Sequence, residues 1–274
     1  MKKVIEIFER EIKETVVSIS SYPGGIMNNN YIINKKYLFR IKKNPSSLIE
    51  DKRIEKQIEE ELVMKGITIP CLYYSEKEGV KITKFIEEGE NLSSIKLNKK
   101  ILFATARKLK DLHNLKIKAP TDFNIEQKVQ FYREEAFIEK HPLEDKILAN
   151  IKKYYTNSDL CFCHNDLISK NILKCGKNIY FINLEFSANN NPYFDIFSFL
   201  SQNDISGKDK EIFIDAYFYG KAPKNIKQIS NDFSALLDLI WYYWSIMMYK
   251  NDYDPKYSQL EQAKYEKLLS YKFE

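Results

Sequence analysis

The sequence predicts an α+β protein of two lobes, in which a small lobe of sheet and one helix is followed by a larger, mostly helical lobe. Short β-branched and aromatic runs separated by Gly, Pro and Asn fill much of the first 86 residues. Beyond them, apolar residues recur at helical spacing over long segments. One strand-loop-strand pattern around Asp166 interrupts the helices. We therefore expect an N-terminal lobe over residues 1–86, a C-terminal lobe over 87–274 and a cleft between them.

The expected small lobe starts with a helix and continues as strands. Met1–Glu11 places apolar residues at helical spacing among charged ones. A second helix is expected over residues 49–65, because Ile54, Ile58 and Leu62 recur at its period and Gly66 follows its end. β-Branched and aromatic content predicts strands over residues 15–20, 31–33, 37–41 and, as two runs around Glu78-Gly79, 73–86.

The expected large lobe is helical on both sides of the strand-loop-strand unit. Helices are predicted over residues 97–115, 125–140 and 143–155, a strand over 178–182 and an apolar helix from Asp195 to Leu200. The apolar stretch Ala235–Tyr249 is interrupted by Asp238 and is too short to cross a bilayer. The amino-terminal residues lack the continuous apolar run of a signal peptide, so we expect a cytoplasmic protein without membrane insertion.

The four cysteines are expected to be reduced in that compartment. Cys161-x-Cys163-His164 resembles a metal-binding motif, but the alternation around Phe162 is typical of a buried strand and the sequence offers no second ligand pair.

The charge pattern restricts the class of ligand. The chain has 43 basic and 38 acidic side chains, and they are interspersed. No block of like charge indicates nucleic-acid binding, and the small positive excess suits a site for anionic phosphates.

The segment Cys161–Leu173 is the candidate catalytic centre. An apolar run, a polar turn and a second apolar run would aim Asp166 and Asn171 at one point. Phosphoryl transfer needs this pair, a carboxylate that accepts the proton of an attacking hydroxyl and an oxygen donor for magnesium. The alternative is a loop whose polar side chains only satisfy local backbone groups.

Two segments of the small lobe suit phosphate binding. Gly24-Gly25 lies between predicted strands, where backbone amides can cradle phosphate oxygens, although a plain hairpin turn has the same sequence. Arg40 ends a predicted strand and Glu55 lies on the predicted helix. A strand cation held by a helix glutamate orients nucleotide phosphates in kinases, whereas an arbitrary pair of this kind is a solvated surface couple.

Both tryptophans fall in the last third of the chain. Trp241 and Trp244 are three residues apart and so share one face of a helix. They are either a pair of core aromatics or one wall of a box for a quaternary ammonium group, whose charge is attracted by indole faces.

Together these segments resemble the choline and ethanolamine kinase family, within the aminoglycoside phosphotransferase-like kinases. Five motifs occur in the family's order. They are Gly24–Asn28 (GG-hydrophobic-T-N, with Met27 for Thr), Tyr37–Ile41 (third strand), Lys81–Glu87 (hinge strand), His164–Leu173 (HNDL…NIL) and Trp241-x-x-Trp244. The resemblance implies a protein-kinase-like fold, ATP and Mg²⁺ as cofactors, and choline or ethanolamine as the small-molecule substrate, with the nucleotide on the first lobe and catalysis on the second.

The same resemblance assigns roles to residues. It makes Asp166 the base, Asn171 a magnesium ligand and Asp195 the acid that braces the catalytic loop. The residues it places at the nucleotide are Gly25, Asn28, Arg40, Glu55 and Ile86. Those it places around the substrate's ammonium group are Glu185, Phe186, Trp241 and Trp244, with Tyr257 or Tyr253.

One position departs from the family pattern. Asn183 stands where the D-x-E-Y motif has a metal-binding aspartate. An amide offers one uncharged oxygen, so metal binding and turnover are expected to be weaker. Asn183 alone supports one alternative function, a catalytically silent module that binds nucleotide or choline. A separate alternative is a kinase of another small alcohol such as an aminoglycoside or thiamine.

Overall fold

The structure is a computed structural model that describes residues 1–23, 28–43, 56–155 and 160–273. Its backbone forms two compact units, of which the first joins residues 1–97 with 169–186 and the second joins 98–168 with 187–274. The sequence predicts one boundary between residues 86 and 87, whereas this grouping adds residues 87–97 and 169–186 to the first unit. The reason is strand pairing between distant segments, because β6 (Glu90–Asn91) is hydrogen-bonded to β8 (Ile172–Cys175).

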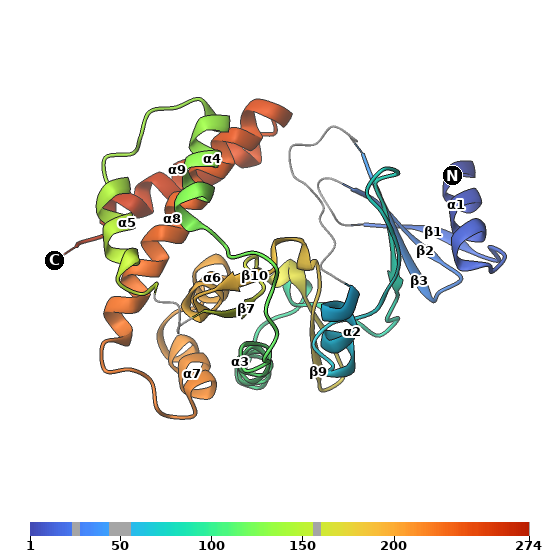
Figure 1. Cartoon of the computed structure of the whole chain (residues 1–274), viewed down its shortest axis with the longest axis horizontal. Helices are drawn as coiled ribbons and strands as arrows, with labels where there is room; N and C mark the ends of the chain where they lie inside the picture. Colours follow the sequence, from blue (N-terminus) through green and yellow to red (C-terminus); the bar gives the residue numbers. More distant parts are fainter. Residues whose placement is uncertain (24–27, 44–55, 156–159, 274) are drawn as a thin grey trace. The chain divides into compact units, whose positions relative to one another are not determined.

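The first unit is built on an antiparallel sheet in the order β1-β2-β3-β5-β4. Its strands are β1 (Ile19–Tyr22), β2 (Asn28–Ile33), β3 (Tyr37–Lys42), β4 (Cys71–Ser75) and β5 (Val80–Lys84). Helix α1 (Lys2–Ile12) covers one face of this sheet (Figure 1). There Phe8 packs with Phe39 and Ile82 in a buried apolar cluster. Successive residues of a strand point to opposite faces, so Arg40 and Lys81, the neighbours of Phe39 and Ile82, point to the other face.

Smaller elements complete the first unit. Helix α2 is described from Lys56 to Met64. Strands β6 and β8 form a second sheet with β9 (Asn178–Phe181) in the order β6-β8-β9. The 3₁₀ turns are η1 (Leu92–Ser94), η2 (Ser169–Asn171) and η3 (Leu184–Phe186). Phe181 N–H donates to the carbonyl of Ile67, which ties β9 to the segment after α2.

The second unit is mostly helical. Its elements are α3 (Lys99–His113), α4 (Ile125–Ala136), α5 (Glu144–Lys152), β7 (Cys161–Cys163), β10 (Ala188–Asn190), α6 (Pro192–Gln202), α7 (Gly207–Phe218), α8 (Ile226–Asp252) and α9 (Pro255–Ser270). The long helix α8 packs against α4, α5, α6 and α9 (Figure 1). Strand β7 pairs with β10 in a two-stranded ribbon. No helix among the described residues is long and apolar enough to span a membrane.

The observed elements confirm the predicted α+β class, with differences at their ends. The strand predicted over residues 15–20 begins only at Ile19, because the amides of Val17 and Ser18 donate to the side chain of Asn34 instead of to a neighbouring strand. Helix α4 ends at Ala136 rather than 140, where Phe137 takes a left-handed conformation with φ of 50°. Helices α7 and α9 are not among the predicted elements, because their apolar residues gather only weakly on one helix face.

Candidate active site

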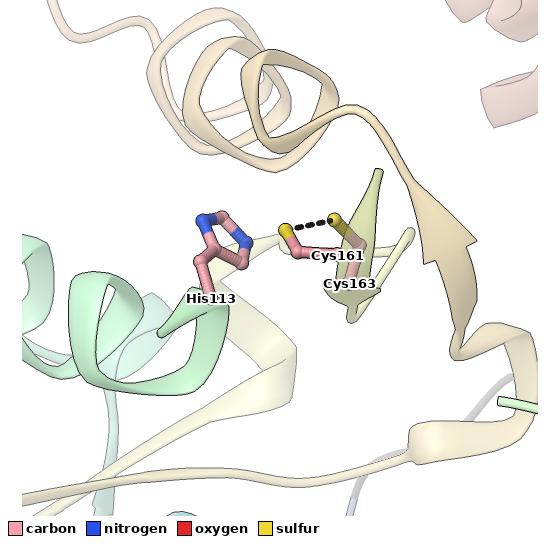
Figure 2. Close-up of side chains that lie close together, drawn as sticks. All are labelled: His113, Cys161 and Cys163. Carbon is pink, nitrogen blue, oxygen red and sulfur yellow. Dashed lines mark hydrogen bonds between the residues drawn. The ribbon is translucent and has the colours of Figure 1, made fainter. Parts of the chain in front are cut away.

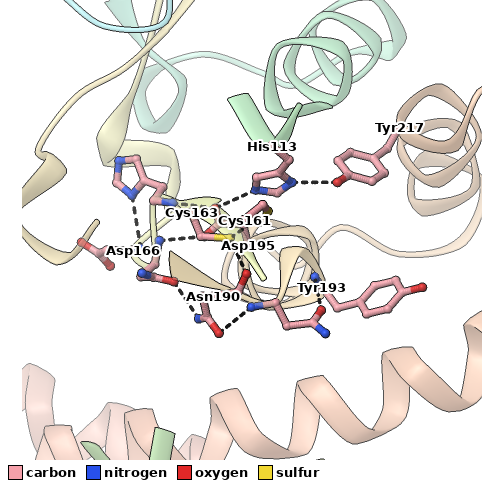
Figure 3. A network of polar contacts seen from close by, with 11 residues as sticks. His113, Cys161, Cys163, Asp166, Asn190, Tyr193, Asp195 and Tyr217 are labelled. Carbon is pink, nitrogen blue, oxygen red and sulfur yellow. Dashed lines mark hydrogen bonds and ion pairs between the residues drawn. The ribbon is translucent and has the colours of Figure 1, made fainter. Parts of the chain in front are cut away.

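The turn His164-Asn165-Asp166 directly follows β7, and Asp195 holds it in place. Asp195 lies in the first turn of α6 and is fully buried. Its two carboxylate oxygens accept the backbone amides of His164 and Asn165, each at 2.7 Å (Figure 3). A carboxylate that accepts two consecutive amides fixes the direction of the chain entering Asp166, and the catalytic role expected of Asp195 stays a prediction.

A buried histidine completes the surroundings of Asp195. His113, at the end of α3, places Nε2 3.0 Å from Asp195 Oδ2 and Nδ1 2.7 Å from the hydroxyl of Tyr217. A carboxylate only accepts, so Nε2 carries the proton that faces it. Burial opposes ionisation of Asp195, but the hydrogen bond from His113 and those of the His164 backbone outweigh it and lower the pKa of Asp195.

Asparagines hold the other side of the turn. Asn165 has φ of 63°, a left-handed conformation that asparagine tolerates better than most residues. Asn190 Nδ2 donates to Asn165 Oδ1 at 2.7 Å, and the backbone amide of Asn191 donates to Asn190 Oδ1 at 2.7 Å (Figure 3). The turn thus has hydrogen-bonded partners on both sides, and the half-buried side chain of Asp166 extends from a fixed backbone.

A tyrosine that the sequence did not single out lies near Asp166. Burial and the negative charge of Asp166 together raise the pKa of Tyr132 to about 12. Tyr132 belongs to α4, and α4 packs against α8, the helix that carries both tryptophans. No sequence signal distinguishes Tyr132 from the other tyrosines of the chain, since its proximity to Asp166 arises only in the folded unit.

The paired indoles predicted from spacing do form a contact. The rings of Trp241 and Trp244 meet edge to face with centroids 4.9 Å apart, and Trp244 meets Tyr257 of α9 edge to face at 5.5 Å. Both tryptophans are half-buried, whereas Tyr257 is buried. An aromatic group of three with two partly accessible indoles is compatible with a cation-binding wall. Tyr253, the other candidate, is exposed just beyond α8.

In the first unit, two cations lie side by side on the sheet face opposite α1. Arg40 and Lys81 are cross-strand partners of β3 and β5. They line a recess together with Leu38, Glu59, Thr68, Ile69, Cys71, Thr83, Ile182, Asn183 and Leu184. Alternation with Val80 and Ile82 was the sequence signal that could have identified Lys81. Paired cations on a sheet face suit the phosphates of a nucleotide.

Arg40 connects the residues that follow β9. It donates to Asn183 Oδ1 at 2.5 Å and to Glu185 Oε1 at 3.2 Å. Lys81 Nζ lies 3.8 Å from the same oxygen of Glu185. Asn183 Nδ2 in turn donates to Asn171 Oδ1 at 2.7 Å. The structure therefore brings both predicted metal ligands together with Arg40 and Glu185.

This cluster fits a hard divalent cation in the type and placement of its donors. Magnesium takes oxygen ligands, completed by substrate phosphates, and the amide oxygens of Asn171 and Asn183 belong to touching side chains. When bound, the ion would neutralise charge on the transferring phosphoryl group. Both oxygens accept a hydrogen bond here and neither is charged, so a metal ion would share the Asn183 oxygen with the Arg40 guanidinium, which repels it. We expect a weak site rather than a mismatched one.

The remaining predicted residues have different positions. Gly25 and Glu55 lie outside the described residues. Asn28 begins β2, Ile86 follows β5 with its carbonyl accepting the amide of Gly89, and Phe186 ends η3. Each of their proposed ligand contacts stays a prediction.

Glu59 is an acid of α2 that sequence reasoning missed. It is 7% exposed, lines the Arg40 recess and accepts the backbone amide of Cys71 at 2.7 Å. Its spacing of four residues from Glu55 within the helix predicted over residues 49–65 was a usable signal, because residues four apart share a helix face.

Comparison with known proteins decides the family. A model of the choline/ethanolamine kinase family matches residues 15–269. The chain belongs to the choline/ethanolamine kinase family. One relative is Protein LicA of Haemophilus influenzae, which is 26% identical over 206 residues, or 71% of this chain and 61% of that protein. The match thus spans less than two thirds of that relative's length.

Solved structures place the fold of this choline/ethanolamine kinase family member. The crystal structure of LicA in complex with AMP is 20% identical, has a TM-score of 0.76 and covers 99% of this chain and 98% of that one. The ADP-bound aminoglycoside phosphotransferase APH(2″)-Ib is 18% identical, has a TM-score of 0.60 and covers 98% and 97%. These likenesses confirm the predicted kinase-like fold.

Proposed function

We propose that the chain transfers the γ-phosphoryl group of ATP to the hydroxyl of choline or ethanolamine. Family membership supports the reaction class. The observation that carries the proposal is the anchoring of the His164-Asn165-Asp166 turn by Asp195. Phosphoryl transfer depends mainly on positioning and electrostatics, so a base held by a rigid turn is the part that the protein must supply.

The described residues divide the work between them. Asp166 accepts the proton of the substrate hydroxyl. Arg40 and Lys81 contact the phosphates of the nucleotide, and a magnesium ion, when bound, would supply further positive charge to them. The side chains that would hold this ion are Asn171 and Asn183.

The substrate class follows from the aromatic group of α8 and α9. Trp241 and Trp244 are in edge-to-face contact and partly accessible. An indole face attracts an ammonium cation without the help of a carboxylate, by about 1–2 kcal/mol when water is excluded. A trimethylammonium group has no N–H to donate, so it depends on such contacts more than an amine does. We therefore favour choline over ethanolamine as the preferred acceptor.

A substrate panel tests this proposal. ADP release from magnesium-ATP is measured with choline, ethanolamine, thiamine and kanamycin, and with no acceptor. We expect release that depends on choline or ethanolamine and is highest with choline. Release only with thiamine or kanamycin would replace the proposal with a kinase of another alcohol.

One observation favours a second candidate, a silent module that binds nucleotide or choline. Asn183 lacks the charge of a carboxylate and its oxygen is engaged by Arg40. Under this alternative, choline binds, as measured by calorimetry, but neither the natural chain nor Asn183→Asp releases ADP. If Asn183→Asp alone releases ADP, the chain is a kinase impaired at this position.

A further inference from the structure

Three potential metal ligands lie close together at β7, the strand that leads into the His164-Asn165-Asp166 turn. They are His113 at the end of α3 and the two thiols of β7, Cys161 and Cys163 (Figure 2). One ligand atom from each lies within 4.8 Å of the others. His113 and Cys163 are buried, while Cys161 is half-buried and gives the group a side toward solvent. The sequence places His164 next to these cysteines, whereas in the folded unit the histidine that lies near both thiols is His113, 48 or more positions earlier in the chain.

The two sulfurs already have the separation that a tetrahedral ion requires. Residues two apart on a strand point to the same side, so Phe162 faces away while both thiols face His113. The sulfurs are 3.7 Å apart. Two thiolates bound at about 2.3 Å to one tetrahedral zinc ion lie about 3.8 Å from each other. Binding therefore needs little movement of β7.

We propose that His113, Cys161 and Cys163 form a binding site for a thiophilic divalent cation such as Zn²⁺. One nitrogen and two sulfur ligands suit zinc and exclude magnesium, which prefers oxygen. Each thiol gives up its proton when the metal–sulfur bond forms, so binding releases two protons to solvent. Cys161 is the more accessible of the two thiols, so an incoming ion meets its sulfur first.

Ion binding changes the brace of the catalytic turn. Both nitrogens of His113 are hydrogen-bonded, Nε2 to Asp195 and Nδ1 to Tyr217. If the ion binds Nε2, the hydrogen bond to Asp195 is lost. If it binds Nδ1, the hydrogen bond to Tyr217 is lost, and this bond orients the ring toward Asp195. Because Asp195 anchors the amides of His164 and Asn165, the ion loosens the turn that positions Asp166. The inhibition expected from this rests on the proposed function, whereas the metal site does not.

Cobalt provides a direct readout of the site. The full-length chain, kept reduced with a phosphine, is titrated with Co²⁺, whose thiolate complexes have charge-transfer absorption. We expect one ion per chain, displaced by Zn²⁺, and binding at least about 100-fold weaker in Cys161→Ser. Cys175→Ser removes a thiol of β8 and is the matched control, expected to bind like the natural chain. Cys163→Ser serves as a second test once circular dichroism shows it folded.

Absence of thiolate–cobalt absorption, or unchanged affinity in Cys161→Ser, overturns the proposal. In a parallel assay with magnesium-ATP and choline, Zn²⁺ should lower the rate of the natural chain and of Cys175→Ser but not that of Cys161→Ser. A chain that binds Co²⁺ at these thiols yet phosphorylates no alcohol keeps the metal site and refutes the proposed function. A chain that phosphorylates choline without binding Co²⁺ keeps the proposed function and refutes the metal site.

Discussion

Arg40 donates a hydrogen bond of 2.5 Å to the side-chain oxygen of Asn183, and so a strand cation is joined to the position where the family pattern has a metal-binding carboxylate. This contact holds a neutral amide against a guanidinium. The guanidinium of Arg40 therefore has a hydrogen-bond acceptor even though no acid stands at this position. Position 183 is the residue where a single substitution should change turnover most.

Asn183→Asp is predicted to raise turnover. A carboxylate restores a unit of negative charge to the proposed metal site, and aspartate tolerates the left-handed backbone found here, with φ of 63°. We expect at least about a tenfold increase in kcat/KM and a lower magnesium requirement, which corresponds to about 1.4 kcal/mol or more. Magnesium titrations of ADP release measure it. Asn183→Ala is the control and should be less active than the natural chain; equal rates for all three variants would contradict a metal-binding role.

Asp195→Asn is predicted to lower kcat by about 100-fold or more with a smaller change in KM. The amide removes one acceptor for the His164 and Asn165 amides, so the turn before Asp166 loses its fixed geometry. The control is Asp232→Asn, another buried acid of the same unit, which accepts from Tyr154 at 2.7 Å. Both should lower stability in urea by about 1–3 kcal/mol, but only Asp195→Asn should reduce kcat. Equal kcat losses would show that stability alone is responsible.

Stability should depend on pH through the carboxylate of Asp195. The pKa of Asp195 is lowered in the folded protein, so the ionised carboxylate stabilises the fold above its unfolded pKa of about 3.9, and that stabilisation is lost as the pH falls through the folded value. The stability difference between the natural chain and Asp195→Asn should be constant from pH 7 to about 5 and shrink below about 4. Urea unfolding at several pH values measures it, and a difference as large at pH 3 as at pH 7 would contradict the assignment.

Trp241→Ala is predicted to raise the KM for choline and leave the KM for ATP nearly unchanged. Loss of one indole face removes about 1–2 kcal/mol of cation attraction, a factor of about 5 to 30. Tyr249→Ala, on the same helix, removes an exposed aromatic ring and should change neither constant. An unchanged choline KM in Trp241→Ala would make the paired indoles part of the core rather than of the substrate site.

A buried ion pair links α8 to α9 independently of catalysis. Lys264 Nζ lies 2.7 Å from Asp238 Oδ1, and both side chains are almost fully buried. Asp238→Ala leaves the ammonium group without its carboxylate and should cost about 3–5 kcal/mol of the free energy of unfolding. Lys267 and Asp204 form a more exposed pair at 3.4 Å, and Lys267→Ala should cost less than about 1 kcal/mol. Urea unfolding compares the two, and similar costs would refute the distinction.

More of the His164-Asn165-Asp166 turn than of its surroundings could be predicted from the sequence. Strand-loop-strand spacing and the HNDL…NIL motif pointed to Asp166 and Asn171, because these residues lie in one local pattern, whereas Asp195 came from the family resemblance alone. The contact of Arg40 with Asn183 joins residues 143 positions apart, and no periodicity reports such a contact. Likewise, the proximity of Tyr132 to Asp166 and of His113 to the β7 thiols depends on how helices pack.

Strand ends were the least predictable part of the fold. β-Branched content from Thr15 onward suggested a strand, but the Asn34 side chain takes the amides of Val17 and Ser18 and delays its start. A single asparagine placed by a turn therefore overrides local propensity over several residues.

The most direct test of the central claim is the formation of phosphocholine, followed by ³¹P NMR with magnesium-ATP and choline, in the natural chain and in Asp166→Asn. The account predicts phosphocholine from the natural chain and a rate about 100- to 10,000-fold lower in Asp166→Asn, the range expected when a general base is lost. Equal rates in the natural chain and Asp166→Asn would contradict it. So would the absence of phosphocholine from both the natural chain and Asn183→Asp.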